Sequence, residues 1–246
     1  MSAIALYSIK GGVGKTAAAV NLSFIAAEKT GRTLIIDLDP QGSSTYYFRI
    51  KPPKKLSSER LMHGGKKVEK AIKASDYEQL DILPSNISLR NMDIALDDAK
   101  KSKKRLRSLV REFESEYTHT FLDCPPNINL ESENIFRAAD LILVPLIPTP
   151  LSLNSFEKLV EFFRDNGLDE NLLLPFYSMV DRRKSLHKKT LEQREIAGRP
   201  LLPHYIPYSS YVERMGERRE PLPAFSKKSE PSRAFYRLWE DIRSRL

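Results

Sequence analysis

The glycines and lysines of IKGGVGKT, from Ile9 to Thr16, have the types and spacing that bind phosphate. The apolar run AIALYSI precedes them and a helical pattern follows, which is the context in which a GKT ending binds nucleotide. The backbone N–H groups of such a loop and the positive end of the helix dipole attract phosphate. We predict that Lys15 contacts the β and γ phosphates and that the Thr16 hydroxyl contacts Mg²⁺. A glycine-rich turn that binds nothing is the alternative.

Two further segments place carboxylates where predicted strands end. LIIDLDPQG carries Asp37 and Asp39, and THTFLDCPP carries Asp123. The carboxyl ends of parallel strands meet at the edge of the sheet where ligands bind. Asp123 is therefore expected to hold a magnesium water, and Asp39 to orient the attacking water. Each aspartate alone could instead form a turn or a helix cap.

Apolar strand-like runs alternate with helical patterns along the chain, which predicts a doubly wound, mostly parallel α/β sheet flanked by helices. The predicted strands are AIALYSI, TLIIDLD, LDILPS, THTFLDC, DLILVPLI, LLLPFYSMV and HYIPY. The predicted helices cover about residues 16–30, 88–117, 130–139, 155–166 and 185–196, followed by a last helix, PSRAFYRLWEDIRSRL. We expect one domain over residues 1–246, with a mobile basic surface connection at about 46–67.

Composition limits the class of protein. The chain has 246 residues, 41% of them hydrophobic and 29% charged, as in globular proteins. No signal peptide or membrane span is expected. The single cysteine, Cys124, excludes an intrachain disulfide and fits a cytoplasmic location. A net charge of +8 favours contact with nucleic acid or an anionic membrane surface.

The motifs KGGVGKT, DLDPQG and DCPP together resemble those of the ParA/Soj partition ATPases, which share a deviant Walker A P-loop with MinD. The resemblance extends through LDILPSN, AADLILVP, SMVD and IPYSSYVERMGE in family order. It implies a P-loop NTPase that uses ATP and Mg²⁺ and forms a homodimer on ATP binding. It also implies a separate ParB-like or cargo-adaptor protein that stimulates hydrolysis.

The resemblance assigns roles by motif position. Lys10 is expected to reach the ATP of the partner subunit, Lys15 to bind phosphate within the subunit, and Asp39 to serve hydrolysis. Gly11 lies where the partner's loop approaches closely. The expected nucleotide-binding residues are Lys10, Gly11, Gly12, Val13, Gly14, Lys15, Thr16 and Ala17, with Met179, Asp181 and Pro207 near adenine. The expected magnesium residues are Thr16, Asp37 and Asp123.

Two late segments are basic and are predicted to bind DNA without sequence preference. Residues 181–194 have six basic and two acidic side chains, and the tail from Arg214 is also basic. The candidate DNA-binding residues are Arg182, Arg183, Lys188, Lys189, Arg218, Arg219, Lys227 and Lys228. No helix-turn-helix segment precedes the first strand, so sequence-specific recognition is not expected. For each residue alone, a solvated surface charge is the alternative.

The main alternative function is a MinD-like ATPase that binds the membrane surface through its last helix. Phe235, Leu238, Trp239, Ile242 and Leu246 share one face of that helix, which could lie on an anionic membrane or pack on the sheet. An iron protein of the nitrogenase type would need a second cluster cysteine, and neither DLDPQG nor the basic tail suits dethiobiotin synthetase. A DNA-binding scaffold without ATPase activity would need neither Lys15 nor Asp39.

The sequence therefore predicts a cytoplasmic, nucleoid-associated ATPase. Its ATP dimer is expected to bind DNA nonspecifically, and hydrolysis to release it, so that a plasmid, chromosome region or protein assembly is positioned over the nucleoid. IPTPLSLN, at 147–154, and the basic connection depart from the family pattern, so they leave the partner's identity open.

Overall fold

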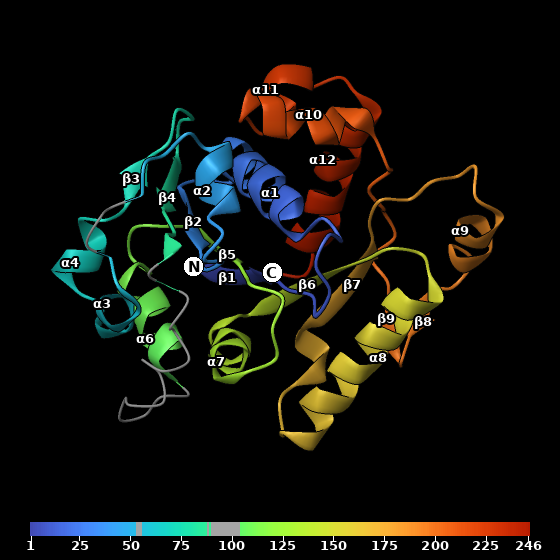
Figure 1. Cartoon of the computed structure of the whole chain (residues 1–246), viewed down its shortest axis with the longest axis horizontal. Coiled ribbons are helices and arrows are strands. Elements are labelled where there is room, and N and C mark those ends of the chain that lie inside the picture. The colour runs from blue at the N-terminus through green and yellow to red at the C-terminus, as the bar shows by residue number, and fades with distance from the viewer. Residues whose placement is uncertain (53–55, 88, 90–103) are drawn as a thin grey trace.

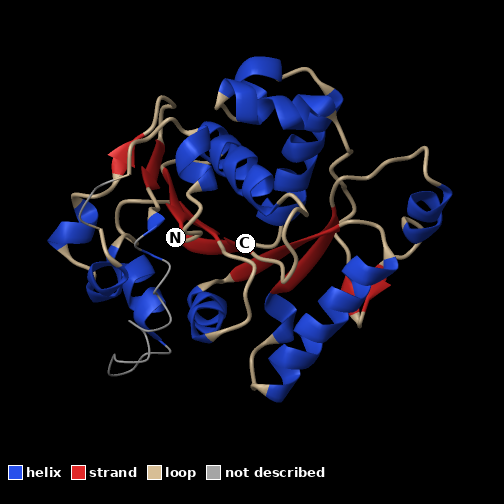
Figure 2. Cartoon of the chain, viewed as in Figure 1, coloured by secondary structure: helices blue, strands red, loops and turns tan. Residues whose placement is uncertain are grey.

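A twisted β-sheet with helices on both faces forms the centre of the protein (Figures 1 and 2). The computed structural model describes residues 1–52, 56–87, 89 and 104–246. The main sheet of this part has the order β3-β4-β2-β5-β1-β6-β7 and is parallel except for the β3–β4 pair. Its strands are β1 (Ser2–Leu6), β2 (Thr33–Asp37), β3 (Lys73–Ala74), β4 (Leu80–Leu83), β5 (His119–Asp123), β6 (Leu141–Leu146) and β7 (Leu173–Tyr177). The predicted fold class is confirmed.

The sheet is buried on both faces, which explains the continuous apolar character of its strands. On one face lie α1 (Lys15–Lys29) and α12 (Glu230–Arg243), which pack against each other. On the other face lie α6 (Arg105–Glu112), α7 (Leu130–Ala138) and α8 (Pro150–Asp165). The strands between these layers therefore need apolar side chains in both directions.

The last helix packs into this core. Phe235, Leu238, Trp239 and Ile242 of α12 are each at most 1% exposed, whereas Leu246 lies beyond the helix and is exposed. The apolar face of α12 was expected either to bind an anionic membrane or to pack on the sheet, and in the structure it packs on the sheet. The face that would enter a membrane is already covered.

Shorter elements surround the carboxyl ends of the strands and the edges of the sheet. They are α2 (Ser43–Tyr47), α3 (Ser58–His63), α4 (Lys66–Glu69), the 3₁₀ helix η3 (Glu170–Leu172), α9 (Ser185–Thr190), α10 (Ser210–Arg218) and α11 (Leu222–Ser226). A small hairpin joins β8 (Glu195–Ile196) to β9 (Arg199–Pro200). The 46–67 segment contains α3, and its Leu56, Leu61 and Met62 are buried against the core.

Three predicted boundaries are wrong, each for a local reason. HYIPY forms no strand but only one bridge, between Val180 and Pro207, because proline has no N–H to donate to a ladder. The helix expected over 185–196 ends at Thr190. Residues 195–200 form the β8–β9 hairpin instead, whose two-residue turn, Ala197 and Gly198, has positive φ at both positions. Helix α8 begins five residues earlier than predicted, with Pro150 in its first turn. The long helix expected over 88–117 lies partly outside the described residues, and α6 occupies its described part.

Candidate nucleotide-binding site

A cavity of about 410 Å³ lies at the carboxyl ends of the strands, over the start of α1. It brings together parts of the chain that are far apart in sequence: the glycine loop, the segment after β2, and the segments after β7. Nine of the predicted site residues line it: Gly11, Gly12, Gly14, Lys15, Thr16, Ala17, Asp39, Met179 and Pro207. Its volume and its place at the sheet edge fit a nucleotide.

The glycine loop depends on glycine at two of its positions. Gly12 and Gly14 have φ of 72° and 92°, in the left-handed region that a Cβ disfavours. A Cβ on Gly14 would also lie 2.9 Å from the Ser178 Oγ. Among the described residues, no atom lies within 4 Å of where a Cβ on Gly11 would be, so no contact in that part of the chain requires a glycine there. Val13, by contrast, points into the core and is 2% exposed.

Lys15 is the buried cation of the loop. Its side chain is largely covered, and its Nζ donates a hydrogen bond to the Lys10 carbonyl at 3.2 Å. Burial lowers the pKa of Lys15, while the nearby Asp123 carboxyl acts in the opposite direction. The ammonium is therefore held beside carboxylates without a close ion pair, in a position where phosphate oxygens can replace a backbone carbonyl as its acceptor.

Asp37 and Asp123 lie side by side at the ends of β2 and β5, where the two residues are register partners. Asp123 accepts hydrogen bonds from Thr16 Oγ1 at 3.3 Å and from Ser44 Oγ at 2.7 Å. Asp37 accepts two from Thr45, one from its N–H and one from its hydroxyl, both through Oδ2. Both carboxyls are fully buried, and burial raises both pKa values; repulsion from Asp123 adds to the rise at Asp37, and repulsion from Asp39 adds to the rise at Asp123.

These residues fit a divalent cation. The Asp37 Oδ1 atom is buried and accepts no hydrogen bond from any described residue, so one carboxylate oxygen lacks a compensating charge or donor. Two carboxylates and a threonine hydroxyl form a hard oxygen donor set, which suits Mg²⁺. Thr16 and Asp123 would hold the ion and its waters, with Asp37 behind them, and the ion would offset the repulsion between the two carboxyls.

Asp39 lies in the cavity wall, nearer to solvent than the other two carboxyls. Its Oδ1 accepts the N–H of Gln41 at 2.9 Å, in the turn that leads to α2. One oxygen thus fixes the side chain while the other has no protein donor among the described residues. A carboxylate held in this way can orient a water.

The far end of the cavity is formed by the segments after β7. Met179, with φ of 54°, and Pro207 line it as expected, whereas Asp181 does not, because its carboxylate pairs with Arg183 at 2.9 Å. That pair lowers the pKa of Asp181 to about 2. Sequence reasoning missed Tyr47, Tyr208, Ser209, Val212 and Glu213, which also line the cavity. IPYSSYVERMGE contains four of these five, but it carries neither a glycine loop nor a carboxylate directly after a predicted strand, so no sequence pattern there indicates a ligand.

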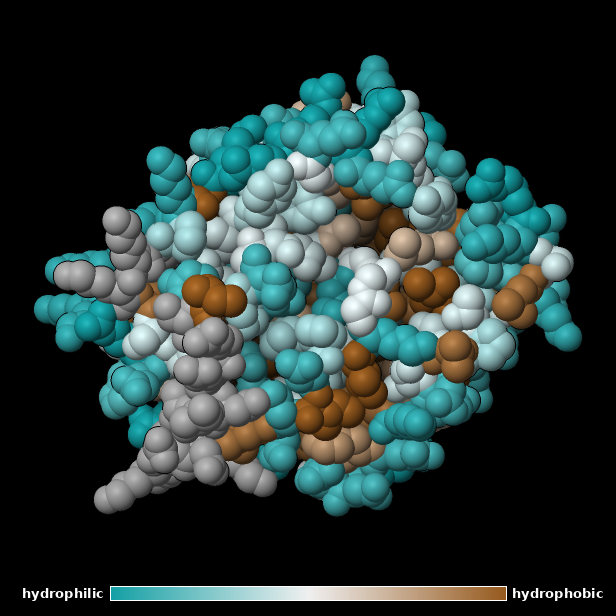
Figure 3. Space-filling model, in the orientation of Figure 1, coloured by the Kyte–Doolittle hydropathy of each residue, from teal (hydrophilic) through white to brown (hydrophobic). Residues whose placement is uncertain are grey.

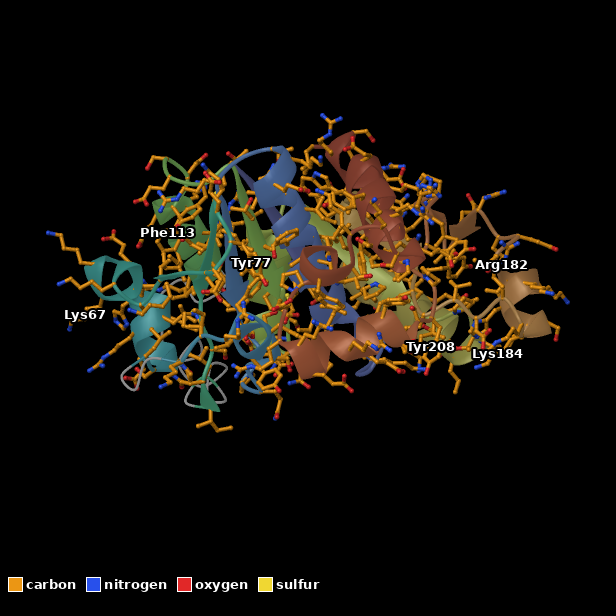
Figure 4. The ribbon with its side chains drawn as sticks, turned by 90° about the horizontal axis from the view of Figure 1, so that it is seen from above. Lys67, Tyr77, Phe113, Arg182, Lys184 and Tyr208 are labelled. Carbon is orange, nitrogen blue, oxygen red and sulfur yellow. The ribbon has the colours of Figure 1, made fainter. Side chains whose placement is uncertain are left out.

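The predicted DNA-binding residues differ in whether they are already paired. Four of them contact other parts of the chain: Arg183 pairs with Asp181, Lys227 with Glu28, Arg219 stacks on Tyr46, and Arg218 stacks on Phe225. Arg182, Lys188, Lys189 and Lys228 are exposed and have no partner in the part of the chain that the structure describes. Arg182, Lys188 and Lys189 lie in or beside α9, at one end of the molecule (Figures 1 and 4).

The chain is similar to known proteins over nearly its whole length. A family described as "AAA domain" matches residues 1–172. The chain is 28% identical over 251 residues to the chromosome partitioning protein ParA of Caulobacter vibrioides, a match that covers 98% of this chain and 94% of that protein.

Solved structures share the fold. A putative plasmid partition protein of Borrelia burgdorferi, bound to AMPPNP, superposes with a TM-score of 0.85 at 21% identity, covering 100% of this chain and 99% of that chain. The septum site-determining protein MinD of Pyrococcus horikoshii, complexed with Mg-ADP, superposes with a TM-score of 0.79 at 20% identity, covering 98% and 95%. Among the described helices, none has the length and apolar character needed to cross a membrane.

Proposed function

The chain belongs to the AAA-domain family of ParA and MinD P-loop ATPases, and from that premise we propose that it is an ATP-driven DNA-binding switch. It dimerises on ATP, binds DNA without sequence preference in that state, and leaves DNA after hydrolysis. The observation that carries the proposal is that Lys15, Thr16 and Asp39 line one cavity, with Asp123 directly behind Thr16.

Each residue of the cavity has a distinct task in this proposal. The loop N–H groups and Lys15 bind the phosphates, and Thr16 and Asp123 hold magnesium, with Asp37 supporting them. Magnesium, when bound, neutralises charge on the phosphates. Asp39 orients the attacking water, because it is held by one oxygen at the edge of the cavity. Met179 and Pro207 contact the adenine.

Dimerisation is proposed to occur through the face around the glycine loop. Lys10 reaches the phosphates of the partner subunit, and the open space at Gly11 admits the partner's loop. Three large apolar side chains, Ile87, Ile128 and Leu151, are exposed on the segments after β4, β5 and β6. They lie at the same sheet edge as the nucleotide, so a partner covering the phosphates would also cover apolar surface. ADP lacks the γ charge that Lys10 meets, so hydrolysis weakens the dimer.

The exposed cations beside α9 are the proposed DNA contacts. Arg182, Lys188 and Lys189 are free of intramolecular partners among the described residues, and much of the surface at the α9 end of the molecule is hydrophilic, although Leu186 is also exposed there (Figure 3). Lys228, also free within that part of the chain, is the corresponding candidate on the C-terminal segment. Unpaired cations bind phosphate without first losing another partner, so they contribute more to nonspecific DNA binding than the paired ones do.

The cellular role follows from the switch. We propose a cytoplasmic, nucleoid-associated protein that segregates or positions a cargo, with a ParB-like or adaptor protein stimulating hydrolysis. The MinD-like alternative needs an apolar helix face for the membrane. In this chain the corresponding face of α12 is buried, so the DNA-binding function is the better supported.

Replacing Asp39 by alanine tests the switch. We expect Asp39→Ala to slow phosphate release by at least about 100-fold, because water orientation is lost. It should also prolong the ATP-dependent binding of two unrelated DNA duplexes, measured by gel shift. The exposed Asp165 provides a matched control, Asp165→Ala, which should behave as wild type. Equal DNA binding in ATP and ADP would exclude the proposed switch.

A further inference from the structure

Helix α2 connects the buried carboxyls of the nucleotide site to α10, on the far side of the cavity. Ser43 is the first residue of α2 and Ser44 the second, directly after DLDPQG. Ser44 is completely buried, and its hydroxyl donates to Asp123 Oδ2 at 2.7 Å. The only other side chain that donates to Asp123 among the described residues is Thr16, at 3.3 Å. Ser44 therefore makes the shorter of the two hydrogen bonds that orient this carboxylate.

The next residue of α2 holds the other carboxyl. Thr45 donates both its N–H and its hydroxyl to Asp37, at 2.8 and 2.7 Å, and its hydroxyl also accepts the N–H of Ser85 at 2.9 Å. Two consecutive residues thus set the orientation of both carboxyls. Helix α2 has only five residues, too few to be stable without tertiary contacts. Its position depends on what holds its other end.

The other end of α2 is held by α10. The Arg219 guanidinium lies 4.4 Å from the centre of the Tyr46 ring, and its Nε donates to the Tyr46 carbonyl at 3.0 Å. The Tyr46 hydroxyl donates back to the Gly216 carbonyl at 3.2 Å. Arg219 itself has φ of 55°, a left-handed conformation that is unfavourable for a residue with a Cβ. The contacts to Tyr46 offset that cost.

We propose that Ser44 is a positioning residue for metal-dependent nucleotide binding and that Arg219 keeps Ser44 in place through α2. The proposal rests on the proposed function, in which Asp123 serves magnesium. A carboxylate near a metal works through the direction of its oxygens, and hydrogen bonds from neighbouring residues fix that direction. Without the Ser44 hydroxyl, Asp123 would keep only the longer hydrogen bond from Thr16. The Thr16 hydroxyl is itself expected to contact magnesium, so it would not orient Asp123 independently of the metal.

The proposal gives Arg219 a role other than DNA binding. Its side chain faces α2, and its two interactions with Tyr46 would have to break before it could contact a DNA phosphate. Arg219 is therefore separated from the free cations beside α9, and a substitution at Arg219 should act first on the nucleotide site.

The first experiment measures how binding of a fluorescent ATP analogue depends on magnesium. In Ser44→Ala, the magnesium concentration that gives half of the full effect should rise about 10-fold, as is typical when a hydrogen bond to a metal-site carboxylate is lost. Affinity for the analogue in EDTA should stay within about twofold of wild type, because no phosphate contact changes. Ser23→Ala is the matched control: Ser23 is equally buried, but its hydroxyl donates to Val20 on α1. An unchanged magnesium requirement in Ser44→Ala would overturn the proposal.

The second experiment tests the connection from Arg219. Arg219→Lys keeps the charge but removes the Nε donor, and it should raise the magnesium requirement about threefold in the wild-type background. In a Ser44→Ala background its effect should be clearly smaller, since the Ser44 hydroxyl is gone and only the Thr45 contacts to Asp37 remain for α2 to position. Arg214→Lys, on the same helix but stacked on Tyr211, is the control. An equal effect of Arg219→Lys in both backgrounds would contradict the proposal. If wild-type binding shows no magnesium dependence, the proposed function fails instead.

Discussion

At the scale of single residues, the two buried carboxyls of Asp37 and Asp123 make the stability of the site depend on pH. They are adjacent and fully buried, burial raises the pKa of both, and the Asp123 carboxyl raises the pKa of Asp37 further. A carboxyl with a raised folded-state pKa stabilises the fold when it is protonated, below its ordinary pKa of about 4. That stability is lost as pH rises through the folded-state pKa, because the folded protein then holds two buried charges. The nucleotide-free protein thus becomes less stable toward neutral pH, where magnesium is needed.

Replacing Asp37 by asparagine should raise the stability of the nucleotide-free protein and weaken its magnesium-dependent nucleotide binding. Asp37→Asn removes one of the two charges, and its amide can still accept from Thr45. At pH 8 in EDTA, the thermal unfolding midpoint should rise by about 5 °C, and the difference from wild type should shrink toward pH 4. Magnesium-dependent nucleotide binding should weaken in the same variant. Unfolding measured by circular dichroism tests the first part; parallel pH curves for the two proteins would refute it.

Lys10 and Lys15 separate dimerisation from binding. Lys15 lies buried in the cavity wall, so Lys15→Ala should abolish nucleotide binding by the monomer. Lys10 does not line the cavity, so Lys10→Ala should leave monomer affinity within about threefold and prevent the ATP-dependent dimer. Both are best measured in the Asp39→Ala background, by fluorescent nucleotide binding and by light scattering. An ATP dimer of normal stability in Lys10→Ala would rule out its proposed reach into the partner.

At the scale of elements, α9 carries the cations that are free to bind DNA. Changing Arg182, Lys188 and Lys189 together to Gln should reduce the slope of log affinity against log salt by up to about 3, since each phosphate contact contributes about 0.9. The matched control changes Lys66, Lys67 and Lys70 of the α4 segment, which are exposed at the other end of the molecule (Figure 4). Loss of affinity of similar size in both triple variants would show that the effect is general charge and not an α9 surface.

At the scale of the whole molecule, α12 completes the core and is not available for a membrane. Trp239 is the single tryptophan of the chain, and it is fully buried against His119 and Phe121. Its emission should be that of a buried indole and should not change when anionic vesicles are added to the ATP-loaded protein. The protein should also stay in the supernatant when the vesicles are sedimented. Co-sedimentation with an emission change would favour the MinD-like alternative.

The sequence by itself determined the parts of this protein whose chemistry is local. The glycine loop, the strand-end aspartates and the apolar strands were predictable because φ > 0, phosphate contact and burial on both faces each demand particular residue types at fixed spacing. The order of the strands, the packing of α12 beside α1 on one face of the sheet and the shape of the cavity were not predictable in this way. They depend on contacts between distant segments.

Only the tertiary structure showed that a helix, α2, forms from Ser43 to Tyr47 and runs into the start of the surface connection predicted at about 46–67. Its five residues lack a helical pattern of their own, and they are helical because Asp37, Asp123 and Arg219 each hold one of them. The same holds for HYIPY, whose apolar residues suggest a strand, although its Pro207 lacks the N–H donor that a ladder needs at that position. The types and spacing of residues in the glycine loop determine where phosphate is expected to bind. Contacts between distant segments decide which other side chains surround that phosphate site.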